Sequence, residues 1–499
     1  MDFSFDLTSR VPTVAALLLA LFVGKIVSGL LTSKKKKRLP PVAGTIFHQL
    51  INFKRLHDFN TELCHKYKTY RLLTPTNKQV YTSDPANIEY ILRTNFNNYG
   101  KGSFNYENSS DLFGDGIFAV DGDKWRHQRK IASYEFSTRV LRDFSSTVFK
   151  INAAKLAQII SEISNRKEVI DIQDLFMKST MDSIFKVGFG IELNSLQGSE
   201  EGNRFSNAFD RSSSLILLRY VDPFWKIKKY FNIGSEAELK KHIKIVNDFV
   251  YKLINVKIEN PQNPEIDSAE KEDLLSRFLA EMERDPENMT RKYLRDIILN
   301  FLIAGKDTTA GTLSWFIYML CENPQTQENV AREVQDATKN ENDTNFEDFA
   351  NLLTEEAIDK MQYLHAAITE TLRLFPSVPL DSKVCFSDDT LPDGFHTGKG
   401  DVVFYMPYAM GRMKYLWGED AEIFRPERWI DPNGFFQPES PFKFTAFQMK
   451  IFAAVLLYFF EFKLRNQKEV INYRTMITLY IDNGLHVYAV PRQKVRVML

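Results

Sequence analysis

The stretch LRDIILNFLIAGKDTTAGTLSWFIYML, residues 294–320, is a long apolar run with a short polar motif at its centre. Its apolar residues recur at helical spacing, which predicts a helix in the protein interior. The motif AGKDTT, residues 304–309, places a glycine and two threonines where a buried helix disfavours them. Threonine hydroxyls can hydrogen-bond to the backbone and open a helix locally, so the motif predicts a small polar notch in an apolar wall. A loosely packed helix with a polar surface turn is the alternative, and the apolar flanks favour the notch.

The rest of the chain has the composition of a folded protein with a large apolar interior. Of its 499 residues, 44% are hydrophobic and 26% charged, and the 40 phenylalanines and 20 tyrosines suit a large core or an apolar ligand. Basic and acidic residues number 64 each, so no overall field favours nucleic acid, and we expect no such partner. The three cysteines, Cys64, Cys321 and Cys385, are far apart and in no metal-ligand spacing. This usage predicts a reducing compartment and no metal site.

The amino terminus predicts a membrane anchor. Residues 11–31, VPTVAALLLALFVGKIVSGLL, are apolar except for Lys25 and long enough to span a bilayer. The cluster KKKKR at 34–38 follows the run, which predicts that the main domain faces the cytosol. A cleavable signal peptide is the alternative, although its charges normally precede the apolar run. We therefore divide the chain into an anchor at 1–32, a basic and proline-containing linker at 33–45, and one folded domain at 46–499.

The folded domain reads as mainly α-helical with small β-sheets. Apolar residues recur at helical spacing over 141–163, 243–258 and 294–320. Strands are predicted at 78–83 (KQVYTS) and 401–406 (DVVFYM). At the carboxyl end, MITLYI (476–481) and LHVYAV (485–490) flank Asn483 and Gly484, a pair suited to a tight turn, so a hairpin is predicted.

Three further motifs carry charged residues in suggestive positions. Glu370 and Arg373 in ETLR lie three residues apart and share a helix face, which by itself usually indicates a surface pair. Arg428 in FRPERW can join them to make a buried three-membered ion network. Trp125 and Arg129 in WRHQR lie one helical turn apart, and both side chains can donate hydrogen bonds to a carboxylate.

The order and spacing of these motifs resemble the cytochrome P-450 superfamily of haem-thiolate monooxygenases over nearly the whole chain. The segments AVDGDKWRHQRKIASYEFS, VPLDSK, LPDG and PYAMGRMKYLWGEDAEIFRPERW are most similar to the plant fatty-acid hydroxylase branch. The resemblance implies that Trp125 and Arg129 hold the haem propionates and that Asp307 and Thr308 relay protons. It implies that Glu370, Arg373 and Arg428 form a structural triad. Substrate contacts are implied around 104–118, along the long helix and after ETLRLFP.

The same resemblance implies the cofactor, the partners and the location of the protein. Haem iron is the expected cofactor, and NADPH is expected to act only through a partner reductase. A long-chain fatty acid is the expected substrate, with a single-pass attachment to the endoplasmic reticulum membrane and a cytosolic main domain. The segment DPFWKIKKYFNIG, residues 222–234, interleaves aromatic residues with lysines and predicts a second contact with membrane lipid. A solvated basic loop packed by its aromatic residues is the alternative.

One element of the family pattern is missing from the sequence. The segment KFTAF (443–447) resembles the start of the family's haem-ligand loop, and MKIFAAVLLYFF (449–460) resembles the end of the helix behind it. Gln448 alone separates them, and no cysteine lies near. Met449 can ligate haem in principle, but a methionine in an apolar helix is far more often core, and a thioether lacks the electron push of a thiolate.

The missing segment leaves two classes of function open. One is a membrane-anchored fatty-acid hydroxylase, impaired in this chain. The other is a non-catalytic relic with the family fold and at most an interaction role. The junction is consistent with loss of a coding block, and alternative splicing and a mistaken gene model both remain open.

Overall fold

The computed structural model describes residues 37–75, 78–137, 139–259, 274–287, 289–340, 344–438 and 447–492. Within these ranges no helix combines the length and the apolar character needed to cross a bilayer. The predicted anchor at 1–32 lies outside the described residues. The prediction of a mainly helical fold with small sheets is confirmed.

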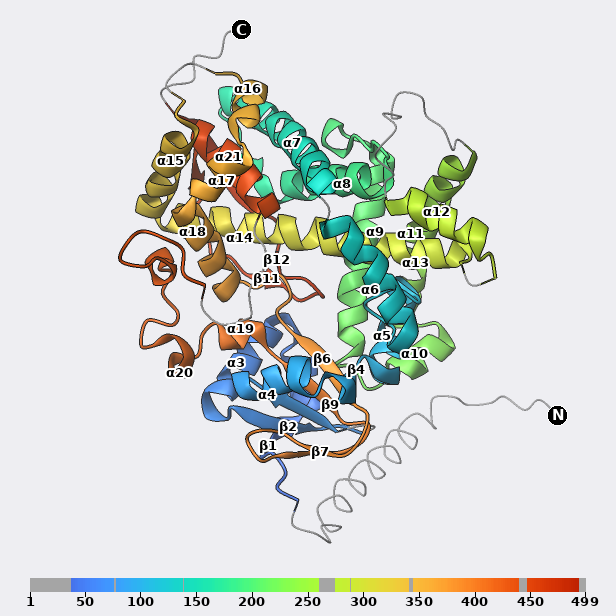
Figure 1. Ribbon diagram of the computed structural model, residues 1–499. Coiled ribbons are helices and arrows are strands. Elements are labelled where there is room, and N and C mark those ends of the chain that lie inside the picture. Colours follow the sequence, from blue (N-terminus) through green and yellow to red (C-terminus); the bar gives the residue numbers. More distant parts are fainter. Residues whose placement is uncertain are drawn as a thin grey trace, which may run out of the picture.

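A six-stranded sheet lies at one end of the molecule, at the bottom of Figure 1. Its strands, in spatial order, are β1 (Val42–Thr45), β2 (Thr69–Leu73), β3 (Gln79–Thr82), β9 (Val402–Tyr405), β6 (Asp381–Cys385) and β4 (Tyr99–Gly100). Strands β3 and β9 confirm the two predicted strands, and they pair in parallel although they are distant in sequence. The stacked rings of Tyr70, Tyr81 and Phe404, with centroids 5.1 and 4.7 Å apart, fill one face of the sheet.

The predicted carboxyl-terminal hairpin is wrong in its pairing. Asn483 and Gly484 do adopt the left-handed conformation of a tight turn, with φ of 63° and 81°. The flanking strands enter different sheets. Strand β12 (Tyr480–Ile481) pairs with β11 (Tyr473–Arg474), whereas β13 (His486–Pro491) pairs with β10 (Phe460–Leu464) and β5 (Ile170–Asp171). The side chains of Asp171 and Gln173 accept the N–H groups of Leu485 and Ile481, so partners distant in sequence replace the local pairing.

Helices make up the rest of the domain. The first half contains α2 (Ile46–Ile51), α3 (Leu56–Lys66), α4 (Pro85–Glu89), α5 (Gly102–Phe113), α6 (Gly122–Ser137), α7 (Arg139–Asn165), α8 (Ile172–Phe189), α9 (Glu200–Arg219), α10 (Trp225–Phe231) and α11 (Gly234–Glu259). The second half contains α12 (Leu274–Arg284), α13 (Arg291–Leu302), α14 (Thr308–Glu322), α15 (Pro324–Thr338), α16 (Phe346–Leu352), α17 (Glu355–Lys360), α18 (Gln362–Leu374), α19 (Pro407–Met410), α20 (Lys414–Trp417) and α21 (Phe447–Phe459). Two short strands, β7 (Asp389–Thr390) and β8 (His396–Thr397), form a separate ribbon.

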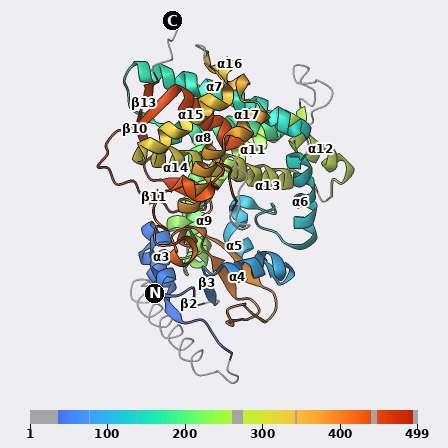
Figure 2. The same cartoon turned by 60° about the vertical axis from the view of Figure 1, so that its left-hand side comes forward.

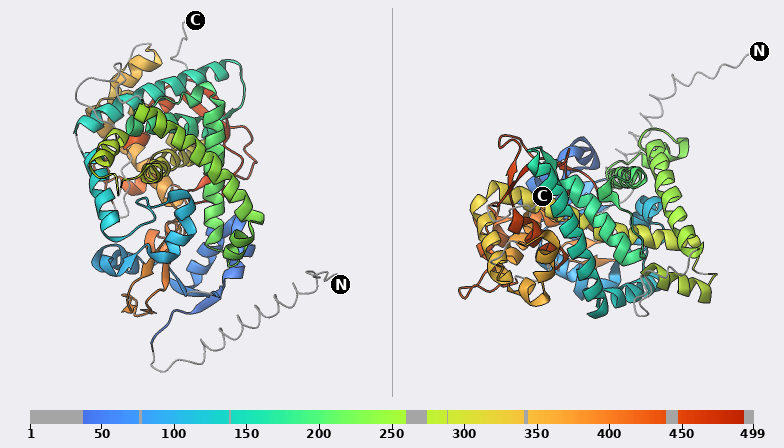
Figure 3. Two further views of the ribbon diagram at one scale, coloured as in Figure 1. Left: turned by 90° about the vertical axis from the view of Figure 1, so that its right-hand side faces the viewer. Right: turned by 90° about the horizontal axis from the view of Figure 1, so that it is seen from above.

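Helices α13 and α14 cross the middle of the molecule and organise the core (Figure 1). Figure 2 shows α7, α15 and α17 gathered at the end opposite the six-stranded sheet, and the left panel of Figure 3 shows the blue amino-terminal elements below the green helices. Helix α21 packs among α7, α14, α15 and α18, and its side chains from Met449 to Phe459 are buried except for the half-buried Tyr458. Met449 lies in this apolar cluster and is 5% exposed, as expected of a core methionine.

Candidate functional site

The central helix opens at the predicted polar motif. Between α13 and α14 the chain makes one π-helical turn, η5 (Ile303–Asp307), and the Thr308 hydroxyl donates a hydrogen bond to the Ala304 carbonyl at 2.6 Å. A Cβ atom at Gly305 would lie 2.6 Å from Ile184 Cδ1 and 2.9 Å from its Cγ1, so a larger residue there would force this side chain of α8 to move. Ala304 is exposed and Thr308 is half-buried, although the helix around them is buried. The predicted local opening is confirmed, and it borders a space reached by solvent.

Asp307 lies in a buried charged cluster away from that space. Tyr480 Oη donates a hydrogen bond to Asp307 Oδ1 at 2.7 Å, and Lys306 Nζ lies 2.9 Å from both Asp307 Oδ1 and Asp210 Oδ1. Burial opposes the charge on Lys306, but the two carboxylates outweigh it and hold the pKa of this ammonium above its usual value. Burial raises the pKa of Asp210 to about 6 in spite of Lys306. The structure therefore does not bring Asp307 and Thr308 into one space, and their proton-relay role stays a prediction.

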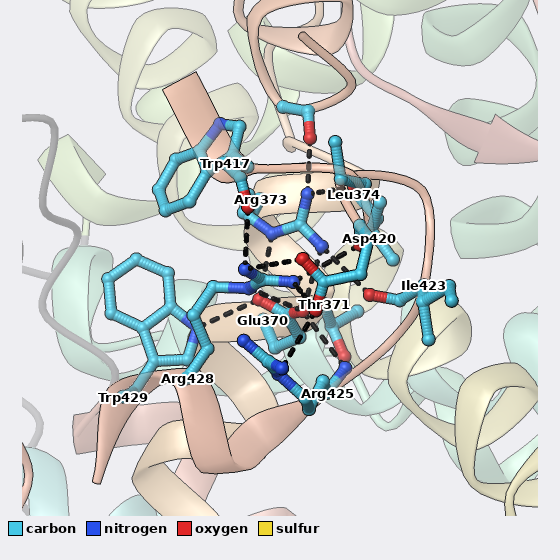
Figure 4. Close-up of polar contacts among 12 residues, drawn as sticks. Glu370, Thr371, Arg373, Leu374, Trp417, Asp420, Ile423, Arg425, Arg428 and Trp429 are labelled. Atoms are coloured by element: carbon cyan, nitrogen blue, oxygen red, sulfur yellow. Dashed lines mark hydrogen bonds and ion pairs between the residues drawn. The ribbon is translucent and has the colours of Figure 1, made fainter. Parts of the chain in front are cut away.

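The structure brings together the three residues of the implied triad (Figure 4). Glu370 is completely buried and accepts hydrogen bonds from Arg373 Nε and Nη2 at 2.8 and 2.7 Å. Arg428 Nε lies 3.4 Å from Glu370 Oε1. The Trp429 indole N–H and the Arg425 backbone N–H complete the shell of this carboxylate at 2.8 and 2.9 Å. Residues 425–429 are thereby tied to helix α18.

The two arginines also fix the segment that precedes residues 425–429. Arg373 donates to the backbone carbonyls of Gly411, Ala421 and Ile423, and Arg428 Nη1 donates to the Trp417 carbonyl at 2.9 Å. A Cβ atom at Gly411 would lie 1.9 Å from the Arg373 carbonyl oxygen, so glycine is required there. Arginine pairs with carboxylates and carbonyls through a planar fork of donors, which gives such a cluster a defined geometry.

Trp125 and Arg129 lie on helix α6, where the indole is half-buried and the guanidinium exposed. The Trp125 ring packs against Phe96 with centroids 5.7 Å apart. The helix begins beside the start of α5, because Asp121 accepts hydrogen bonds from the backbone N–H groups of Lys101 and Gly102 at 2.8 and 2.7 Å.

Two lysines beside this helix start were missed by sequence reasoning. Lys383 on β6 lies close to Lys101, and burial together with the Lys101 charge lowers the pKa of Lys383 to about 8. The carboxylates of Asp381 and Asp121 offset this repulsion only in part. Burial and the nearby Lys101 charge thus disfavour the charged form of Lys383. The motifs GKG around Lys101 and DSK around Lys383 do not indicate from the sequence that the two lysines are neighbours, because they are far apart along the chain.

None of the three cysteines is placed as an iron ligand. Cys64 is buried in α3 with its Sγ 3.9 Å from Met406 Sδ, and burial raises its pKa to about 12. Burial also raises the pKa of Cys321 to about 12 and that of Cys385 above its usual value. Iron binds the thiolate, which these environments disfavour.

The donor set does not fit the iron of a haem-thiolate centre. Within the described ranges no group of three or more His, Cys, Asp and Glu side chains could hold a free metal ion. The segment that leads into α21, residues 439–446 (ESPFKFTA), contains neither cysteine nor histidine. The propionate-holding roles of Trp125 and Arg129 stay predictions, and the sequence contains no thiol between residues 439 and 446.

A mainly helical domain, a central helix opened at AGKDTT, and a buried Glu–Arg–Arg network define a haem-monooxygenase fold. The sequence profile of the family "Cytochrome P450" matches residues 38–479, and the chain belongs to this family. It is 49% identical to Cytochrome P450 704C1 of Pinus taeda, with 96% of this chain and 97% of that protein covered. It is 43% identical to Cytochrome P450 704B1 of Arabidopsis thaliana, with 90% and 93% covered. It is 34% identical to Cytochrome P450 86B1 of Arabidopsis thaliana, with 96% and 90% covered.

The first of these alignments also shows a difference in length between the two proteins. It extends over 512 residues, which is longer than the 499 residues of this chain. The Pinus taeda protein therefore contains residues that have no counterpart here.

Proposed function

We propose that this chain is a member of the fatty-acid hydroxylase branch that has lost the cysteine ligand of its haem and is catalytically impaired. The parent activity is hydroxylation of a long-chain fatty acid with dioxygen and electrons from an NADPH-dependent reductase. The observation that carries the proposal is the absence of any cysteine between Pro426 and Leu499, together with the longer alignment to the Pinus taeda protein.

The residues around the central helix support an apolar substrate. Ala304 and Thr308 are accessible, and the helices on either side of them, α13 and α14, carry buried apolar side chains. A bound haem supplies the activation of dioxygen, and that chemistry depends on an axial thiolate. The role assigned to this chain's own residues is to hold the carboxylates of that group at Trp125 and Arg129, with Lys101 and Lys383 as further cations near the start of α6.

The experiment is a ferrous–carbon monoxide absorption spectrum of the purified full chain. We expect no thiolate-type Soret band. A variant with a family-like cysteine loop inserted between Gln448 and Met449 is expected to show the band and to contain more haem. The matched control carries the same loop with serine in place of cysteine, which separates the ligand from the packing of the loop. A thiolate-type band from the unmodified chain would overturn the proposal.

A non-catalytic relic is the second candidate, and the buried side chains of α21 favour it. This helix spans the junction at Gln448 and Met449, and its apolar residues from Met449 onwards still belong to the largest buried apolar cluster. A chain that folds stably without haem, with the same melting temperature as the insertion variant, would support the relic. A chain that is short-lived without the loop would support an impaired enzyme.

We further propose that the protein lies on the endoplasmic reticulum membrane, with α10 as a second contact besides an amino-terminal anchor. Tyr230, Phe231 and Ile233 are 83%, 65% and 54% exposed, which is unusual for neighbouring apolar side chains. Trp225 is less available, because the Arg219 guanidinium covers its ring at 4.5 Å. Aromatic residues next to lysines suit the headgroup region of a bilayer.

A further inference from the structure

Helix α10 lies beside helix α5, and two of its lysines are paired with carboxylates there (Figure 1). Lys226 Nζ makes an ion pair with Glu107, and Lys229 Nζ lies 2.7 Å from Asp111 Oδ2. The two ammonium groups also lie 5.6 and 5.8 Å from the centre of the Trp225 ring, whose face attracts cations. Both lysine charges are therefore held close to α5 and its carboxylates.

Two further cations next to α10 are matched in the same way. Lys228 Nζ lies 2.5 Å from Asp222 Oδ2, whose side chain is 2% exposed. The buried Arg219 guanidinium lies 2.6 Å from Glu236 Oε2 and also 2.6 Å from Asp111 Oδ2. Four cations thus face four carboxylates, and these eight side chains together carry no net charge. The surface that they form is neutral, although the sequence of α10 itself is basic.

The same helix presents apolar side chains to solvent. Ile227 is 46% exposed, in addition to the exposed Tyr230, Phe231 and Ile233. Apolar side chains that are exposed so close together indicate a contact with another apolar phase. Their transfer into a bilayer needs no charge on the lipid, because the free energy of transfer depends on the apolar area that leaves water.

A lysine that is paired with a carboxylate gains little from an anionic lipid. The lipid charge attracts the lysine and repels the carboxylate beside it, and at nearly equal distances the two effects cancel. A lysine without such a partner gains about 1 kcal/mol near an anionic bilayer, which is about fivefold in binding. The ion pairs of Lys226 and Lys229 therefore determine whether the contact of α10 depends on lipid charge.

We propose that the carboxylates of α5 neutralise α10, so that this helix fits a zwitterionic bilayer surface as well as an anionic one. The inference rests on the proposed membrane contact of α10 and adds the kind of lipid that the contact accepts. The apolar side chains make the contact, and the lysines stay with Glu107 and Asp111. The basic segment DPFWKIKKYFNIG by itself indicates the opposite, an attraction to anionic lipid.

The test places the full chain in vesicles of phosphatidylcholine, with or without phosphatidylserine. Hydrogen–deuterium exchange of peptides covering 224–233 measures the contact, and the unmodified chain is expected to exchange at equal rates in both kinds of vesicle. Glu107→Gln frees Lys226 and should slow this exchange about fivefold in the vesicles with phosphatidylserine relative to those without it. Lys226→Gln leaves the Glu107 charge unpaired and should have the opposite effect.

The matched control is Glu201→Gln, which frees Lys252 from an ion pair of similar exposure near the start of α9 and should leave the exchange unchanged. Salt at about 1 M should abolish the effect of Glu107→Gln, because charges are then screened within about 3 Å. Slower exchange of the unmodified chain with phosphatidylserine, no response to Glu107→Gln, or a response that persists in salt would overturn the inference alone. Equal exchange of the unmodified chain and of Tyr230→Asp combined with Phe231→Asp in every vesicle would overturn the proposed membrane contact and the inference with it.

Discussion

Replacing Glu370 with glutamine tests how much the buried ion network contributes to the stability of the domain. The carboxylate is fully buried and accepts four hydrogen bonds of 2.7–2.9 Å, two of them from Arg373. Glutamine keeps the size of the side chain and removes its charge. The guanidinium groups of Arg373 and Arg428, which are 3% and 8% exposed, are then left without that counter-charge.

Breaking a buried ion pair by removing one partner costs about 3–5 kcal/mol, because an uncompensated charge remains in the interior. Domains are stable by about 5–15 kcal/mol, so the loss should be a large share of the total. We expect Arg373→Gln to be as damaging as Glu370→Gln, since Arg373 holds three backbone carbonyls as well. Arg428→Gln should cost less, because its contact with Glu370 is longer, at 3.4 Å.

Urea unfolding followed by tryptophan fluorescence is a suitable assay, since Trp417 and Trp429 lie inside the network. The control is Glu356→Gln, which removes a carboxylate from an exposed helical pair with Lys360 and should leave the midpoint unchanged. A Glu370→Gln variant within about 1 kcal/mol of the unmodified chain would refute the reasoning.

Three further changes have expected outcomes. Burial, reinforced by the Arg412 charge, lowers the pKa of His57 to about 3, so below pH 6.5 the unfolded chain binds a proton that the folded chain does not. The free energy of unfolding should therefore fall by about 1.4 kcal/mol for each pH unit from 6.5 towards 3. In urea titrations at several pH values, the variant His57→Phe should show a smaller dependence on pH. Gly411→Ala should lower the free energy of unfolding by about 3 kcal/mol, because the added methyl group overpacks the site. Gly122→Ala should lower it by only about 1 kcal/mol, because φ is +65° there but no atom lies within 4 Å. Equal urea midpoints for the two variants would contradict the steric argument. A chain beginning near Pro40 should still bind anionic vesicles in a flotation assay and should lose that binding when Tyr230→Asp and Phe231→Asp are combined. The control is Phe435→Asp, which changes a similarly exposed aromatic residue elsewhere on the surface. Unchanged flotation of this double variant, and of Phe224→Asp combined with Trp225→Asp, would contradict the proposed membrane contact.

Local features of the fold followed from the sequence, whereas long-range pairings did not. The opening at Thr308 was predicted because a hydroxyl bonds within its own helix. Glu370 and Arg373 were predicted to share a face for the same reason. Asp210, the partner of Lys306, belongs to another helix, and no local pattern marks it. The carboxyl-terminal hairpin failed likewise, because the strand His486–Pro491 has a longer partner in Phe460–Leu464.

The proximity of Lys383 and Lys101 could also not be predicted from the sequence. Lysines are normally solvated, and only the packing of β6 against the start of α5 brings these two together. The same limit applies to Asn300, whose polar side chain in an apolar helix marks a buried partner without saying which one it is. Composition and periodicity indicate which face of a helix or strand is buried, whereas the tertiary packing determines which residues that face contacts.

The π-helical turn at 303–307 sets the rotational phase of everything that follows it along the central helix. One residue deleted there would allow an uninterrupted α-helix, but it would turn residues 308–322 by about 100° and draw them back by about 1.5 Å. Trp315, whose indole N–H donates to the Leu479 carbonyl at 3.0 Å, would then point away from its partner. This helix can therefore not have both uninterrupted α-helical hydrogen bonding and the rotation that points residues 308–322 at their present partners. Insertions and deletions within the turn should be far less tolerated than substitutions at the same positions.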